Sequence, residues 1–196
     1  MKQWPLLVCI LIKIGAHAQE FGGNPASQRW SQVNTDTVRV IFPRGLDLQA
    51  KRVASIVHTL QRNYSHSIGD QLRKIDIVLH NQTAISNAYV QLAPYRSEFY
   101  LTPPQDPFEL GAFDWTANLA VHEFRHVQQY SNFNKGFSKL ASLLLGQQGQ
   151  ALANAAAIPD WFFEGDAVFN ETKLTPQGRG RLPLFMNSFR TLFESG

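Results

Sequence analysis

Two kinds of hydrophobic pattern divide the chain into a first part with strands and a later helical part. Apolar and polar residues alternate over residues 37–42 and again over 75–79, which predicts two half-buried strands. Between these strands, after Asp47, apolar residues recur at the spacing of one helix face and predict an amphipathic helix. The residues on this face are Val53, Ile56, Val57, Leu60 and Tyr64.

Two further extended segments follow the second strand. Residues 88–93 and 97–101 are joined by a short turn that contains Pro94, and we expect both to be strands. A group of prolines then ends this part of the chain, because proline supplies no backbone N–H to a sheet. The pattern therefore predicts a small mixed sheet with one packed helix.

From Asp114 onward the pattern is helical. Asp114 is a suitable cap for a helix over 115–130, and a second helix is expected over 139–145. A proline-aspartate pair starts another helix that carries residues 161–170, and 185–193 form the last one. The chain is thus predicted to have an α+β fold, with a sheet half followed by a mainly helical half.

The first 18 residues have the composition of a secretory signal peptide. Lys2 precedes a short apolar run, and residues 16–18 supply the small-x-small ending that a signal peptidase cleaves. We therefore expect a secreted, extracellular or periplasmic protein. Residues 19–36 are rich in small and polar side chains and predict a flexible leader, which leaves 37–196 as a single domain.

Charge and cysteine content exclude several functions. The formal net charge is +3, and both lysines of the signal peptide contribute to it, so a nucleic-acid partner is not expected. The only cysteine, Cys9, lies within the segment to be cleaved, which excludes disulfides and cysteine catalysis in the mature domain. No later stretch is apolar over the roughly 18 residues that a membrane span needs.

A metal-binding pattern lies within the helix predicted over 115–130. His122, Glu123 and His126 form an HExxH motif, whose two histidines are four residues apart and so share one helix face. Zinc accepts two such neutral imidazoles, and the intervening glutamate can serve as general base towards a water on the metal. The alternative is a helix with two surface histidines and a solvated glutamate.

A catalytic zinc requires a third protein ligand, which a later helix supplies. Residues 160–167 contain a W-x-x-E-G motif with Glu164 as its acid. HExxH followed by this motif resembles the gluzincin zinc peptidases, a group that includes thermolysin and the zinc aminopeptidases. The resemblance implies a zincin-like fold, one Zn²⁺ ion, and His122, His126 and Glu164 as its ligands, with Gly165 allowing a close backbone approach. By itself, Glu164 is also compatible with a surface carboxylate.

The chain departs from that family in two respects. His126 and Glu164 are separated by 37 residues, a longer connection than is usual in the family, and its 136–158 segment is expected to form a lid or a groove wall. No tyrosine or histidine follows Glu164 to stabilise an oxyanion. Arg179 and Arg181 supply positive charge there, although a solvated loop is the favoured interpretation for both.

Other polar residues have weaker assignments. Glu171 returns to the helix face of Glu164 and is a candidate to orient a ligand imidazole, but surface charge is favoured for Glu171 and for Asp166. The resemblance implies that an edge strand pairs with substrate, and residues 87–92 are preferred over 96–101 for this part. Structural or solvent-facing roles are expected for His58, His66 and His80.

These observations favour a secreted zinc peptidase that hydrolyses peptide bonds of a peptide or protein substrate, with Glu123 as the base. The alternative is a non-catalytic zincin-like domain that binds peptides or acts as a scaffold. The presence of all four site residues favours the enzyme, because a site without turnover has no chemical need for Glu123. A third hypothesis is that the chain is the catalytic front part of a larger secreted protein.

Overall fold

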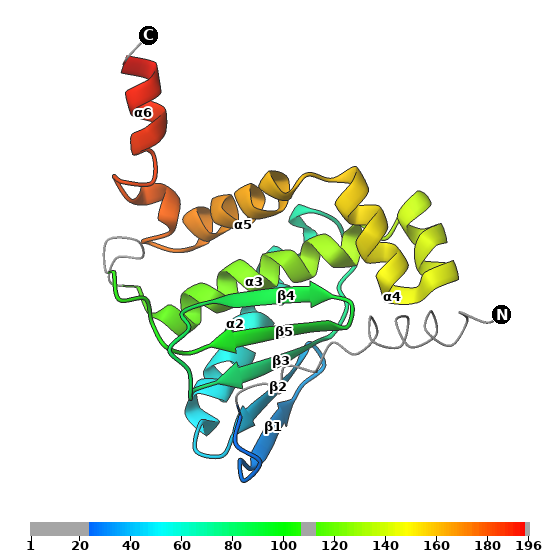
Figure 1. Cartoon of the computed structure of the whole chain (residues 1–196), viewed down its shortest axis with the longest axis vertical. Helices are drawn as coiled ribbons and strands as arrows, with labels where there is room; N and C mark the ends of the chain where they lie inside the picture. The colour runs from blue at the N-terminus through cyan, green and yellow to red at the C-terminus, as the bar shows by residue number, and fades with distance from the viewer. Residues whose placement is uncertain (1–23, 107–112, 195–196) are drawn as a thin grey trace, which may run out of the picture.

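The computed structural model describes residues 24–106 and 113–194 and shows a mixed α/β fold built on one five-stranded sheet (Figure 1). The strand order is β1-β2-β3-β5-β4, with β2, β3 and β5 parallel and with an antiparallel strand at each edge. The signal peptide predicted over residues 1–18 lies outside the described residues. The strands are β1 (Trp30–Asn34), β2 (Val38–Pro43), β3 (Ile75–His80), β4 (Ala88–Leu92) and β5 (Tyr95–Tyr100).

Strand β1 lies in the segment that the sequence assigns to a flexible leader. This prediction is wrong from Trp30 onward, since Trp30 to Asn34 pair with β2 in antiparallel register, from Trp30 opposite Pro43 to Asn34 opposite Arg39. None of the five residues of β1 is fully buried. An edge strand of this kind is held mainly by its backbone ladder, so its side chains need not alternate between apolar and polar.

Five α-helices complete the described structure, and all four helices predicted from the sequence beyond residue 113 are among them. They are α2 (Asp47–Tyr64), α3 (Trp115–Asn132), α4 (Phe137–Ala157), α5 (Asp160–Leu174) and α6 (Asn187–Glu194). Helix α3 begins where predicted, because the Asp114 carboxylate accepts the backbone N–H of Ala117 at 2.9 Å.

Helix α4 is longer than predicted and consists of two segments. It breaks at Gly146, whose φ of 65° lies in the left-handed region that favours glycine. The two segments then approach so closely that a Cβ on Gly149 would lie 2.1 Å from the carbonyl oxygen of Ala141. Glycine at these two positions lets α4 fold back on itself, which the alanine- and glutamine-rich sequence does not reveal.

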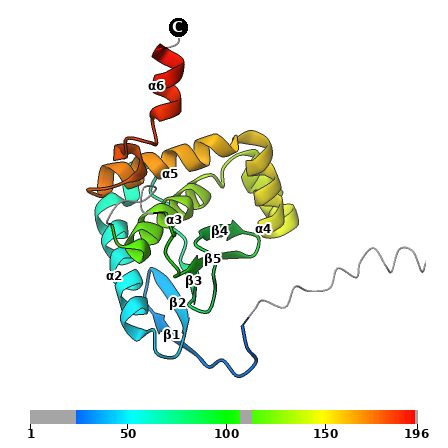
Figure 2. The same ribbon diagram turned by 60° about the vertical axis from the view of Figure 1, so that its left-hand side comes forward.

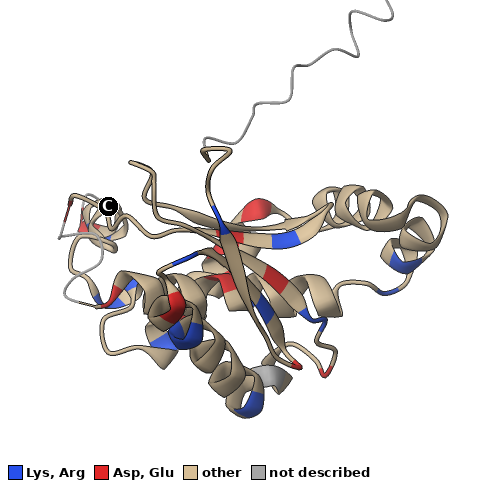
Figure 3. Cartoon of the chain, turned by 90° about the horizontal axis from the view of Figure 1, so that it is seen from below, with Lys and Arg blue, Asp and Glu red and all other residues tan. Residues whose placement is uncertain are grey.

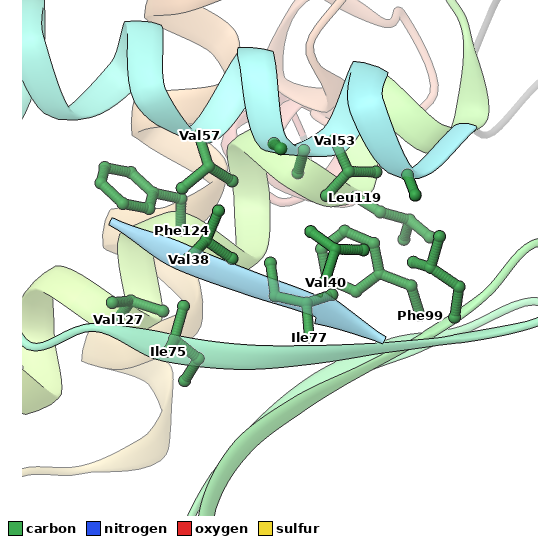
Figure 4. Packing of buried hydrophobic residues seen from close by; sticks show 14 of the residues in the cluster. Val38, Val40, Val53, Val57, Ile75, Ile77, Phe99, Leu119, Phe124 and Val127 are labelled. Atoms are coloured by element: carbon green, nitrogen blue, oxygen red, sulfur yellow. The ribbon is translucent and has the colours of Figure 1, made fainter. Parts of the chain in front are cut away.

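The core lies between the sheet and helices α2 and α3, which cover the same face (Figure 4). Helix α5 lies against α3 on the side away from the sheet, whereas α6 extends away from the rest of the structure (Figures 1 and 2). Helix α3 is therefore enclosed between two layers, with its HExxH motif turned towards α5. The core side chains include Val38, Val40, Val53, Val57, Ile75, Ile77, Phe99, Leu119, Phe124 and Val127.

Charged residues of both signs are interspersed over the structure (Figure 3). One bidentate pair, Arg39 with Asp76, joins β2 to β3. Among the described residues, no helix combines the length and apolar character needed to cross a bilayer.

Removal of a core aromatic ring should destabilise the fold strongly. Phe99 on β5 is 1% exposed, so Phe99→Ala should lower the free energy of unfolding by about 3–5 kcal/mol through lost burial and a residual cavity. Leu48→Ala is the control, because Leu48 is 77% exposed and its loss should change stability by less than about 0.5 kcal/mol. Urea unfolding followed by circular dichroism measures both, and equal effects would contradict the assigned core.

Candidate metal centre

The three predicted ligands converge at the contact between α3 and α5. The Nε2 atoms of His122 and His126 lie 3.3 Å apart, and the Glu164 carboxylate lies 3.3 Å from the first and 3.5 Å from the second. All three ligand atoms fall within 4.8 Å of one another, close enough to hold one metal ion. Both imidazoles are buried, whereas the Glu164 side chain is 63% exposed, so the site is open on the glutamate side.

Glu123 is buried beside this group. Its side chain lines the same cavity as the two histidines, and its Oε2 atom has no hydrogen-bond partner among the residues that the structure describes. Burial raises the pKa of Glu123 to about 7, although the neighbouring His122 acts in the opposite direction. A carboxyl group that lines a cavity and has an oxygen without a hydrogen bond to the described residues can accept one from a water or a substrate.

The second ring nitrogen of His122 contacts Glu171, which is fully buried. The distance from His122 Nδ1 to Glu171 Oε2 is 3.1 Å, so the prediction of a surface charge at Glu171 is wrong and its orienting role is supported. Burial raises the pKa of Glu171, but hydrogen bonds from His122 and Arg179 together with the charge of Arg179 lower it by a larger amount. The pKa of Glu171 is therefore below its usual value. Glu171 is therefore a carboxylate that fixes the ring of His122.

Arg179 is part of this arrangement rather than of a solvated loop. Its guanidinium pairs with Glu171 at 3.0 Å and lies 2.7 Å from His122 Nδ1. A neutral imidazole has one protonated nitrogen and one nitrogen with a free lone pair. If Nε2 of His122 uses its lone pair for a metal, Nδ1 carries the proton and donates to Glu171 rather than accepting from Arg179. Arg179 then neutralises Glu171, and its side chain also lines the cavity that contains Glu123 and Glu164.

Gly178 allows the chain after α5 to approach that helix. A Cβ on Gly178 would lie 2.4 Å from Thr172 Cα, and this close contact places the backbone N–H of Arg179 2.8 Å from Glu171 Oε1. Arg181 instead donates to the Thr172 carbonyl in an exposed position. Gly165 has open space where a Cβ would point, so the expected close backbone approach there is wrong.

Asp166 is also misassigned as ordinary surface charge. It forms a bidentate pair with Arg125 at 2.7 and 2.8 Å, and the Arg125 side chain is only 7% exposed. The second ligand, His126, has its own partner, because its Nδ1 lies 2.8 Å from the side-chain oxygen of Gln129. Sequence reasoning missed Gln129, although its position three residues after His126 places it beside that histidine on the helix.

A cavity of about 1140 Å³ leads to the metal centre. Strand β4 forms one side of it, and β4 is an edge strand, as predicted for 87–92, whereas β5 lies inside the sheet. Helix α4 contributes Ala151, Asn154 and Ala155, so the segment over 136–158 does form a wall. Tyr130, missed from the sequence, lines the cavity with its ring stacked on His126 at a centroid distance of 6.5 Å.

Two of the remaining histidines have structural contacts, as expected. His80 contacts Glu98 at 3.1 Å and stacks on Tyr100, and His66 forms an exposed pair with Asp70. His58, on α2, is exposed and lines only a shallow depression away from the metal centre.

The chain matches no protein-family profile, no curated protein and no solved structure. The functional argument therefore rests on the geometry and chemistry of this site.

The site should bind one divalent cation, and Glu164→Ala should weaken that binding. With Zn²⁺ as the probe, we expect one equivalent on the parent protein and at least a roughly 100-fold loss of affinity in the variant, since removal of an outer partner alone costs 10–100-fold. Competition with a chromophoric chelator measures both values. Glu194→Ala, on α6, is the control, and equal affinity of all three proteins would rule out this site.

Proposed function

We propose that the protein is a secreted zinc-dependent peptidase of the gluzincin kind. The observation that carries this proposal is the convergence of two imidazole nitrogens and one carboxylate beside a buried glutamate with an unpartnered oxygen. The resemblance of the HExxH and W-x-x-E-G motifs supports the same assignment. So does the arrangement of a mixed sheet whose antiparallel edge strand lies along the cavity, which is what a zincin-like fold requires.

The donor set fits zinc. Structural zinc sites use four protein ligands, whereas catalytic sites use three and leave one position open. His122, His126 and Glu164 provide a set of two nitrogens and one oxygen, and the exposure of Glu164 leaves the open position facing the cavity. The unpartnered Oε2 of Glu123 suits a water at that position.

In the proposed mechanism, a zinc ion held by His122, His126 and Glu164 would polarise the substrate carbonyl and lower the pKa of water to about 7. Glu123 takes a proton from the attacking water as a bond forms between the water oxygen and the carbonyl carbon. It then gives this proton to the amide nitrogen as the carbon–nitrogen bond breaks. The products are a carboxylic acid and an amine, and no covalent enzyme intermediate is needed.

The free edge of β4 is the proposed binding site for the substrate backbone. Because Tyr100 donates to the Asn87 carbonyl at 3.0 Å, residues 87, 89 and 91 exchange hydrogen bonds with β5. Ala88 and Val90 consequently direct their backbone N–H and C=O groups away from β5. An extended peptide that adds to this edge would lie along the cavity and pass the metal centre.

Glu123→Gln should abolish peptide hydrolysis without removing the metal. The amide cannot accept the proton of water, so we expect turnover to fall by at least the 10²–10⁴-fold that general base catalysis contributes. Hydrolysis of an unfolded protein measures turnover, and metal analysis of the same samples should give one zinc in parent and variant. Glu194→Gln, a glutamate outside the cavity, is the matched control.

Two outcomes separate the enzyme from the non-catalytic alternative. Turnover by the parent and the control that is lost in Glu123→Gln supports the peptidase. Zinc binding with no hydrolysis by any of the three proteins, but with retained peptide binding, would instead establish a domain without turnover.

Ala88→Pro should impair substrate binding at the β4 edge. Proline removes one N–H that faces the cavity but none that pairs with β5, so kcat/KM for a long peptide should fall about 10-fold, the equivalent of one hydrogen bond. Ala88→Ser keeps this N–H and should retain the parent value. Steady-state kinetics on one fluorogenic peptide compares the three proteins, and unchanged kinetics in Ala88→Pro would place the substrate elsewhere.

A further inference from the structure

The side-chain amide of Gln129 contacts His126 on one side and two residues close to Glu164 in sequence on the other. Its oxygen lies 2.8 Å from His126 Nδ1, and its nitrogen donates to the carbonyl oxygen of Phe163 at 3.0 Å and to Asp166 at 2.8 Å. Both partners of the nitrogen are acceptors, which fixes the orientation of the amide. The oxygen must then accept from His126, so Nδ1 carries the proton and Nε2 is left for a metal.

The contacts on α5 bracket Glu164, the third ligand. Phe163 directly precedes Glu164, and Asp166 follows Glu164 by two residues. Glu164 and Asp166 are therefore separated by roughly 200° around the helix. Phe163 and Ala167 belong to the buried side of α5, so Glu164 and Asp166 lie on opposite flanks of it. Gln129 therefore contacts the backbone just before Glu164 and the Asp166 side chain on the opposite flank of α5.

Gln129 is itself held in place by its surroundings. It is fully buried, and its partner Asp166 is fixed by the bidentate contact with Arg125. Arg125 also donates to Gln128 at 3.0 Å, and Gln128 donates to the carbonyl oxygen of Tyr64 on α2 at 2.9 Å. A side chain with so little freedom can transmit the position of α3 to α5.

We propose that Gln129 is a positioning residue that sets the ring of His126 and the place of Glu164 together, with the Arg125–Asp166 pair holding it. This inference rests on the proposed metal site. His122 has a separate partner, the Glu171 carboxylate, which orients its ring alone. Gln129 contacts both His126 and residues beside Glu164. Gln129 thereby couples the position of the His126 ring to that of Glu164.

The test is Gln129→Met, which keeps the length of the side chain and removes both polar groups. We expect zinc affinity of the full chain to fall 10–100-fold, as for other partners of metal ligands, with a changed absorption spectrum of the cobalt-substituted protein. Asp166→Asn is a second, milder variant that should weaken zinc binding in the same direction. The matched control is Asp76→Asn, which breaks an Arg–Asp pair outside the cavity and should leave affinity unchanged.

A double-mutant cycle with Glu164→Ala tests the coupling. The effect of Gln129→Met should be smaller in the Glu164→Ala background, because only the contact with His126 remains to be lost. Unchanged zinc affinity in both Gln129→Met and Asp166→Asn overturns the inference. The same conclusion holds if these variants lower only the stability of the metal-free protein and leave zinc affinity unchanged. Absence of zinc binding by the parent overturns the proposed function as well, so the two failures are distinct.

Discussion

The packing of α5 against α3 is the contact on which the candidate metal centre depends. Residues four apart on α3 bring His122 and His126 together through local helix geometry alone. The third candidate ligand, Glu164, comes from another helix, and its position is set only by how that helix packs. Phe163 and Ala167 provide the apolar part of this contact, and the polar contacts on either side of them provide its register.

Helix α3 is unusual in the number of polar side chains that it buries. His122, Glu123, Arg125, His126 and Gln129 are each at most 7% exposed. Burial of polar and charged groups is costly unless each finds a partner, and such groups concentrate where function requires them. Here the imidazoles and the arginine are paired within the network, whereas Glu123 keeps one oxygen without a partner. That exception lies where the proposed reaction needs a base.

The features that were predictable from the sequence are those determined by local pattern. Alternation identified β2 and β3, the cap at Asp114 placed the start of α3, and the two motifs identified all three residues of the metal-binding group. Strand β1 was not predicted, because an edge strand depends on backbone pairing rather than on a periodic pattern of apolar side chains. The partners of the ligands were not assigned for a different reason. Helical spacing made Glu171 a candidate to orient an imidazole, but Asp166 and Glu171 differ from surface acids only through contacts with α3 and with Arg179, which sequence spacing does not specify.

The central claim is that one zinc ion is bound by two imidazoles and one carboxylate. Zinc K-edge X-ray absorption on the purified protein measures this coordination directly. Our account predicts four light-atom neighbours at about 2.0–2.2 Å, two of them with the scattering of imidazole rings, and the loss of one of these rings in His126→Ala. A spectrum without imidazole scattering, or one that is identical in the parent and in His126→Ala, would contradict it.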